Sequence, residues 1–183
     1  MNKDLADVLG NLVNRCLSFV ATRFGGVVPD GSAEVGEAAL AAELEAQLAA
    51  LRAAHETAQL RKAAAAARAI WSLANGYLAA QAPWSAIRTE PVRAAAATRV
   101  AVNLVRLAAV TAWPFLPASA EQVLAALGEP AGVPPFPADA RAALAAIPAG
   151  RAVSAPPLLF AKIDAGTVAR LEARYGGAEG TRS

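Results

Sequence analysis

The chain has 183 residues, of which 56% are hydrophobic and 5% aromatic, and its formal net charge is +2. This length and apolar content suffice for one sizeable core, so we expect a single main domain with a tail. No uncharged apolar run reaches about eighteen residues and the N-terminus lacks the features of a secretory signal, so a membrane span and a leader are not expected. The small positive charge permits contact with a polyanion but does not prove it.

One cysteine and one histidine limit the metal and redox chemistry of the chain. Cys16 cannot form an internal disulfide, and its apolar setting predicts a packed thiol in a reducing compartment, of which the cytoplasm is the simplest. Because His55 is the single histidine, the usual four nitrogen or sulfur ligands of a structural zinc site cannot be assembled. We therefore expect no metal site within this chain.

The first predicted helix covers residues 3–24 and ends at Gly25-Gly26, which can adopt positive φ. At about 100° per residue, one apolar seam along this helix consists of Leu5, Leu9, Leu12, Cys16 and Phe19. A neighbouring polar stripe consists of Asn11, Arg15, Ser18 and Thr22. The Asn11 amide and the Arg15 guanidinium project side by side at i and i+4, where both could meet the edge of an unpaired base.

The next two predicted helices are apolar on one face. The second begins near Ser32, and its core face is predicted to carry the leucines at spacings of four, four and three, Leu40, Leu44, Leu48 and Leu51. Its acidic outer face would repel phosphate; its glutamates are Glu34, Glu37, Glu43 and Glu45. The third runs from His55 or Glu56 to Ala80, because the residue before Pro83 avoids the helical region. Trp84 then offers a flat surface on which an unpaired base could stack. Trp71 and Tyr77 are predicted to be core residues.

Beyond Trp84 the pattern predicts two more helices, followed by a proline-rich segment. A fourth helix starts near Pro91 and ends at Trp113-Pro114, and a fifth covers residues 117–127 with Gly128 as its stop. The prolines after Gly128 forbid long helices, although residues 139–147 can form a short one. We expect an all-α bundle over residues 1–128, a proline-rich extension with short helices packing back over 129–175, and a disordered tail over 176–183.

Spacing alone leaves the role of these polar residues open. From spacing alone, Asn11 and Arg15 fit ordinary solvated helix positions better than a binding site, and Trp84 fits a residue that closes the end of the bundle. The Asn75 amide could support Trp84 or satisfy a backbone group of the bundle. Candidates for contact with RNA phosphates are Arg15, Arg23, Arg88 and Arg93.

Four short sequence motifs follow one another along the chain. They cover residues 4–15 followed by 24–29, residues 70–78 leading into 82–84, residues 113–117 followed by 120–123, and residues 157–164. In this order and spacing they resemble the anticodon-binding domain of methionyl-tRNA synthetases, which are class I aminoacyl-tRNA synthetases. The resemblance covers most of the chain.

This resemblance implies a role for specific residues. In the family, the residues that match Asn11, Arg15 and Trp84 recognise the anticodon, and the residue that matches Pro83 sets the tryptophan in place. Beside these family positions, Arg88, Asn75 and Asn14 are further candidates that would support the site or contact the RNA backbone. The implied partners are the CAU anticodon loop of tRNA(Met) and a catalytic domain that this chain lacks.

The family's two ATP-handling signatures, His-Ile-Gly-His and Lys-Met-Ser-Lys-Ser, do not occur in the sequence. ATP and Mg are therefore expected only for the whole synthetase, with no cofactor in this chain, and Met1 is interpreted as a start placed on an excised domain. We expect the chain to bind tRNA and not to catalyse.

Three alternatives remain at the level of sequence. The chain could be the corresponding domain of a leucine, isoleucine, valine or cysteine ligase. It could be a purely structural or oligomerising alanine-rich bundle without an RNA role. An enzyme in its own right is the weakest of the three, because the sequence offers one histidine, no acid and base at useful spacing and no glycine-rich phosphate loop.

Overall fold

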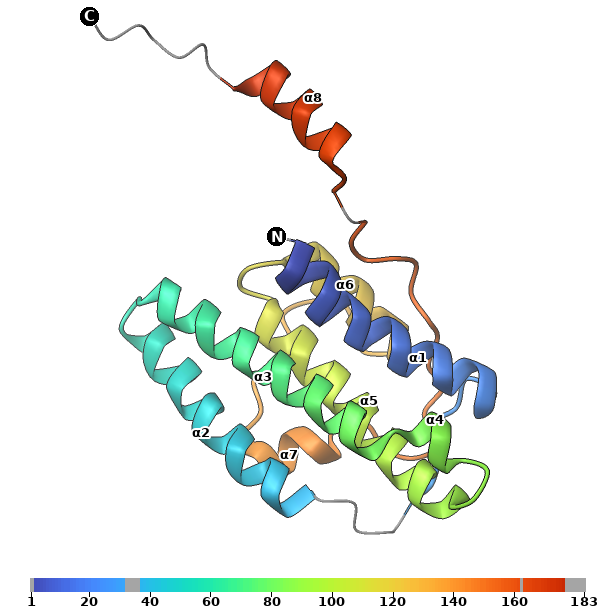
Figure 1. Ribbon diagram of the computed structural model, residues 1–183. Coiled ribbons are helices and arrows are strands. Elements are labelled where there is room, and N and C mark those ends of the chain that lie inside the picture. The colour runs from blue at the N-terminus through green and yellow to red at the C-terminus, as the bar shows by residue number, and fades with distance from the viewer. Residues whose placement is uncertain (1, 32–36, 162, 177–183) are drawn as a thin grey trace, which may run out of the picture.

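The computed structural model describes residues 2–31, 37–161 and 163–176. In these ranges the regular secondary structure is helical, as expected, and long helices pack side by side into a bundle (Figure 1). The expected start of the second helix near Ser32 lies outside the described residues, as does the expected disordered tail of residues 176–183 beyond Gly176. A single antiparallel bridge between Val27 and Ala152 is the only β-type pairing in the described ranges.

The first helix differs in detail from its prediction. A π-helical segment η1 (Asn2–Gly10) leads into helix α1 (Asn11–Arg23), where the sequence predicts one continuous α-helix. Leu9, Leu12 and Cys16 are buried as expected, whereas Leu5 and Phe19 at the ends of the seam are only half-buried. The buried face is wider than the seam because α1 packs against both α3 and α5; it also contains Val13, Leu17 and Val20.

Helices α2 (Glu37–Glu56) and α3 (Leu60–Gln81) form an antiparallel hairpin (Figure 1). The predicted start of the third helix at His55 or Glu56 is wrong, since both residues close α2. The chain reverses over residues 57–59, where Ala58 has a φ of +53°. The leucines predicted for the core of α2 are buried; they are Leu40, Leu44, Leu48 and Leu51.

Helix α5 (Pro91–Ala112) lies at the centre of the bundle and begins with proline in its first turn, as predicted. By length and composition α5 could cross a membrane, but 94% of its most apolar window is buried inside the bundle. It is therefore a core helix. Its alanines leave little side-chain bulk between α5 and its neighbours α3, α6 and α7.

The polar side chains of α5 are satisfied inside the fold. The Asn103 amide donates to the Ile147 carbonyl and accepts from the Ile147 N–H, at 3.2 and 2.6 Å. Arg106 donates through Nε and Nη2 to one oxygen of Glu129, at 3.1 and 2.9 Å. Thr111 accepts a hydrogen bond from Trp71 Nε1 at 3.0 Å. These contacts tie α5 to α3 and to the segments that follow α6 and α7.

The C-terminal third of the described chain begins with α6 (Pro117–Ala126), close to its prediction. Helix α7 (Ala140–Ala145) follows as the predicted short helix, and the Asp139 side chain caps it by accepting from the Ala142 N–H. Backbone hydrogen bonds then join residues 150–153 to residues 26–28. This pairing holds the tail beside the end of α1.

Helix α8 (Ala165–Tyr175) was not predicted individually. The Asp164 carboxylate accepts from the Thr167 N–H at its N-terminus, and these hydrogen bonds lower the pKa of Asp164. None of its residues is buried, and it projects away from the bundle (Figure 1). Its more apolar positions are Val168, Leu171 and Tyr175.

Candidate nucleic-acid interface

A sharp turn at the end of α3 sets the position of Trp84. Ala82 closes α3 in the left-handed region with φ of +38°, and Pro83 follows at once as the first residue of α4 (Pro83–Ala86). The proline ring fixes φ at a helical value and needs no N–H partner there. Pro83 is buried, while Trp84, one residue later, is half-buried at the edge of the core.

The indole of Trp84 lies against the side of α1. The Arg15 guanidinium carbon is 4.3 Å from the centroid of the Trp84 ring, and its cation lies over the face of the indole. Phe19, one turn further along α1, meets Trp84 edge to face with 6.4 Å between centroids. The structure thus brings together Arg15 and Trp84, two residues singled out from the sequence, and adds Phe19 as a support.

Asn11 lies one helical turn before Arg15 on the same stripe and is exposed. Among the residues that the structure describes, neither the Asn11 amide nor the Arg15 guanidinium has a hydrogen-bond partner. Two strong hydrogen-bonding groups therefore face outward beside a half-buried indole, and their donors and acceptors are available to a ligand.

Asn75 has a structural role that the sequence left open. Its Nδ2 donates to the Val8 carbonyl in η1 at 3.0 Å and to the Trp71 carbonyl in α3 at 2.9 Å. The amide is hydrogen-bonded to these backbone carbonyls and not to Trp84. Val8 lies three residues before Asn11, the first residue of α1. The Asn75 hydrogen bond to Val8 therefore holds the N-terminal end of α1 against α3. Trp71 and Tyr77 are buried, as expected for core residues.

The other candidates differ in their surroundings. Asn14 is exposed and accepts a hydrogen bond from Ser18 Oγ at 3.2 Å. Arg88 lies in the turn after α4, and Arg23 ends α1; both are exposed. Arg93 is engaged with Gln81 at 2.9 Å and with Glu90 at 3.7 Å, so it is the least available of these cations.

A hollow of about 520 Å³ extends this face of α1 toward the tail. On one side it is lined by Asn11 and Asn14, and on the other by Leu158 and Phe160 of the C-terminal segment. Sequence reasoning did not place Phe160 near Asn11. The signal was present as an apolar Leu-Leu-Phe run in a proline-rich tail, but spacing cannot say where such a tail returns to the bundle.

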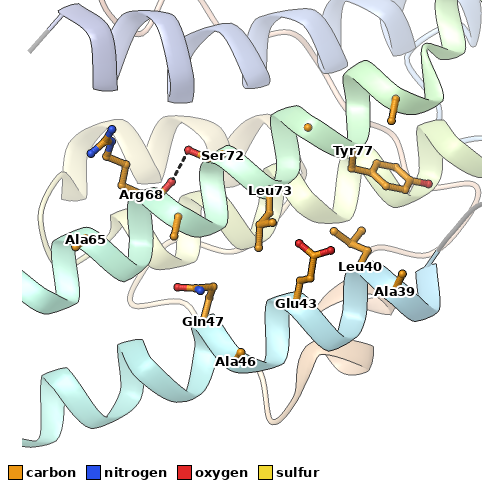
Figure 2. A pocket seen from close by; sticks show the side chains of 13 residues that line it. Ala39, Leu40, Glu43, Ala46, Gln47, Ala65, Arg68, Ser72, Leu73 and Tyr77 are labelled. Atoms are coloured by element: carbon orange, nitrogen blue, oxygen red, sulfur yellow. Dashed lines mark hydrogen bonds between the residues drawn. The ribbon is translucent and has the colours of Figure 1, made fainter.

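A larger hollow lies elsewhere, between α2 and α3 (Figure 2). It has a volume of about 880 Å³, and Figure 2 shows Glu43 of α2 pointing toward α3 and Leu73 of α3 pointing toward α2. Small side chains supply much of the remaining lining. Glu43 and Arg68 are the charged residues that line it, so this groove lacks the excess of cations that a phosphate backbone requires.

In the described ranges, no three His, Cys, Asp or Glu side chains lie close enough together to hold a metal ion. The thiol of Cys16 is buried in the core, and this burial raises its pKa from 9.0 to about 12. The predicted packing of this cysteine is confirmed.

Comparison with solved structures identifies the fold. The chain matches methionyl-tRNA synthetase from Mycobacterium tuberculosis in its apo form with a TM-score of 0.72 and 31% identity, covering 89% of this chain and 33% of that one. The same enzyme bound by methionyl-adenylate gives a TM-score of 0.70 at 31% identity, over 87% of this chain and 32% of the other. The bundle thus has the architecture of a domain found within an aminoacyl-tRNA synthetase.

Sequence comparison narrows this class. Residues 28–180 match the family model described as the anticodon binding domain of methionyl tRNA ligase. The chain is 44% identical to methionine–tRNA ligase of Cereibacter sphaeroides over 97% of its length and 45% identical to that of Caulobacter sp. over 98%. The chain belongs to the anticodon-binding domain family of methionyl-tRNA ligase.

The match covers 31% of the Cereibacter protein and 32% of the Caulobacter protein, so the chain spans about a third of the length of these relatives. The family assignment confirms the resemblance that the four sequence motifs indicate. It does not favour the alternatives of a leucine, isoleucine, valine or cysteine ligase domain, or of a purely structural bundle.

Proposed function

We propose that this chain reads the CAU anticodon of tRNA(Met), with Trp84 stacking on the first anticodon base while Asn11 and Arg15 address hydrogen-bonding edges. The observation that carries the proposal is the group formed by Arg15, Trp84 and Asn11. It combines an aromatic face, a planar fork of donors and an exposed amide within about one helical turn. Unpaired RNA bases are recognised by this combination of stacking and edge contacts.

Because Arg15 stacks on Trp84, an unpaired base must replace the guanidinium before it can stack on the indole. A cation over an aromatic ring at a solvent-accessible site contributes about 0.5–1 kcal/mol. A base stacked on an aromatic side chain contributes about 1–3 kcal/mol. The base can therefore displace the guanidinium from the indole, which releases the donors of Arg15 toward the base edge. In the free protein, Arg15 keeps the indole covered and in position.

Other residues contribute indirectly. Pro83 sets Trp84 at the start of α4, and Asn75 fixes the base of α1 through the Val8 carbonyl. Arg88 is exposed in the turn after α4, within reach of the phosphate side of a loop bound at Trp84, and Asn14 adds an amide to the same face of α1. Contacts with phosphates would make the affinity fall as salt is added.

For the whole protein we propose methionyl-tRNA aminoacylation by a catalytic domain that adjoins this chain, in the cytoplasm, with ATP and Mg²⁺ used there. The side chains in the described ranges do not form a metal-holding group. The part that we propose for this chain in that enzyme is to select the tRNA.

The test compares Trp84→Ala with the unchanged chain for binding of a CAU anticodon stem-loop at two salt concentrations. Loss of one stacked base predicts binding weaker by about 5-fold to 150-fold, which corresponds to about 1–3 kcal/mol. Trp84→Phe keeps an aromatic face and should retain most of the affinity.

Trp113→Ala is the matched control, because Trp113 is also half-buried against the core but lies at the end of α5. It should leave RNA binding unchanged under conditions where the protein is folded. A sharp drop in the melting temperature of Trp84→Ala without a specific loss of binding would show that the indole is a core residue, and the proposal would fail.

A further inference from the structure

The hollow between α1 and the C-terminal tail borders the site proposed around Trp84 and shares Asn11 with it. It is lined by Asp7, Gly10, Asn11 and Asn14 on the helical side and by Leu158 and Phe160 on the tail side. Its volume of about 520 Å³ falls within the range of about 300–1,000 Å³ that is usual for small-molecule pockets. The hollow is therefore large enough for a flat organic group.

The walls of this hollow differ in chemistry. The Asn11 and Asn14 amides each supply donors and acceptors in one plane, and Asp7 adds a carboxylate to the same wall. Phe160 supplies an aromatic ring on the opposite wall. The described side chains that line the hollow include this carboxylate and no cation, which disfavours a phosphate. An aromatic wall facing amides suits a neutral base.

Phe160 is held in place by its neighbours. A Cβ atom added to Gly10 would lie 3.3 Å from Phe160 Cδ2, so the ring packs close to the helix where it lacks a side chain. The tail that carries Phe160 is fixed a few residues earlier, where Val153 N–H donates to the Gly26 carbonyl and Ser154 N–H to the Ala126 carbonyl. The aromatic wall is thus pre-positioned on the bundle.

Asn11 links this hollow to the Trp84 site. It lines the hollow, and Arg15, which stacks on Trp84, follows four residues later on the same helix. Four residues of α-helix rise about 6 Å, so the two positions are close enough for successive nucleotides of one loop.

We infer that the hollow between α1 and the tail takes a second unpaired base of the anticodon loop, with Phe160 as its stacking surface and Asn11 and Asn14 at its edge. The inference rests on the proposed function, since it requires that an RNA loop binds this face. It makes Phe160 a base-binding residue and the C-terminal tail a wall of the RNA site.

The test is a set of mutant cycles with abasic RNA. CAU stem-loops that lack one anticodon base at a time are titrated against the unchanged chain, Phe160→Ala, Phe160→Leu and Trp84→Ala. Phe160→Leu preserves an apolar contact with Gly10 but removes the aromatic face, so its loss of binding reports stacking and not unfolding. Phe136→Ala is the matched control, because Phe136 is an exposed aromatic of the same proline-rich extension that lies beside Arg52.

With the intact loop, Phe160→Ala should weaken binding by about 5-fold to 150-fold, Phe160→Leu should also weaken it, and Phe136→Ala should not. The effect of Phe160→Ala should vanish with the loop that lacks one particular base. That base should differ from the one whose removal abolishes the effect of Trp84→Ala.

Equal binding of every loop by Phe160→Ala and the unchanged chain, while Trp84→Ala still loses affinity, would overturn this inference and leave the proposed function intact. If the unchanged chain and both alanine variants bind all loops alike, the proposed function and the inference both fail. An effect of Phe160→Ala that persists with every abasic loop would assign the residue to packing of the tail and would overturn the base-binding role.

Discussion

Helices α1 and α5 both carry asparagine and arginine, yet they use them in opposite ways. In α5, Asn103 and Arg106 are buried and bonded to Ile147 and Glu129. In α1, Asn11 is exposed, Arg15 lies over an indole, and neither has a hydrogen-bond partner among the described residues. Buried polar groups need internal partners, whereas exposed ones are free to bind a ligand. Substitutions in α5 should therefore affect stability, and those in α1 should affect RNA binding.

Arg106→Ala should produce the largest effect. The Arg106 and Glu129 side chains are 9% and 15% exposed, and removing the arginine leaves a nearly buried carboxylate without its cation. Breaking such a pair costs about 3–5 kcal/mol of unfolding free energy, which urea denaturation would measure. Arg99→Ala is the control, because its ion pair with Asp30 is more exposed and longer, at 3.8 Å. Equal stability losses in both variants would contradict this account of α5.

Asn103→Ala should follow, with a loss of about 2–4 kcal/mol of unfolding free energy. The substitution leaves the N–H and the carbonyl of the buried Ile147 without partners, and each costs about 1–3 kcal/mol. Thermal and urea melts measure the change, and the folded fraction should still bind the CAU stem-loop normally. Unchanged stability would mean that residue 147 finds other partners.

Features that depend on local sequence could be predicted, whereas contacts between segments far apart in the chain could not. The helical periodicity, the glycine stops and the proline starts predict most helices, because they depend on local backbone preferences. The same holds for Cys16 and the leucines of α2. Contacts between distant segments escape such reasoning: Asn103 meets Ile147 across 44 positions. Phe160 reaches Gly10 only because residues 150–153 pair with residues 26–28.

The site shows the same division. The residue types and spacing predict a polar stripe with Asn11 and Arg15 on α1 and a stacking surface at Trp84, and the family resemblance relates these residues to the anticodon. Local patterns do not contain the stacking of Arg15 on Trp84, since that contact depends on the packing of α4 beside α1. The role of Asn75 was undecidable for the same reason, because its partner Val8 is 67 positions away.

Asn11→Ala should have a smaller effect, and the quantity that it changes should be the affinity for RNA and not the stability of the fold. Loss of one or two hydrogen bonds to a base edge predicts a binding loss of about 2-fold to 10-fold for the CAU stem-loop. The unfolding free energy should change by less than about 0.5 kcal/mol, since the side chain is exposed. Isothermal titration and a thermal melt on the same sample measure both quantities. A stability loss comparable to that of Asn103→Ala would erase the contrast between the two helices.

Cys16 provides the least perturbing check of the core. Burial raises its pKa to about 12, so the thiolate that reacts with alkylating reagents is scarce in the folded protein near pH 8. Iodoacetamide should label Cys16 slowly in the native state and rapidly in urea. Because the unfolded thiol ionises near 9.0 and the folded one does not, this group lowers stability as the pH rises above about 9. Fast native labelling would contradict the packing of α1.

The most direct test of the central claim is titration of the chain with a CAU anticodon stem-loop and with the same loop changed at its first anticodon base, at low and high salt. The account predicts tighter binding of CAU at both salt concentrations, with both affinities falling as salt rises. It also predicts that Trp84→Ala removes the preference for CAU. Equal affinity for the two loops, or no binding of either at low salt, would contradict the claim that the exposed polar groups of α1 read the anticodon.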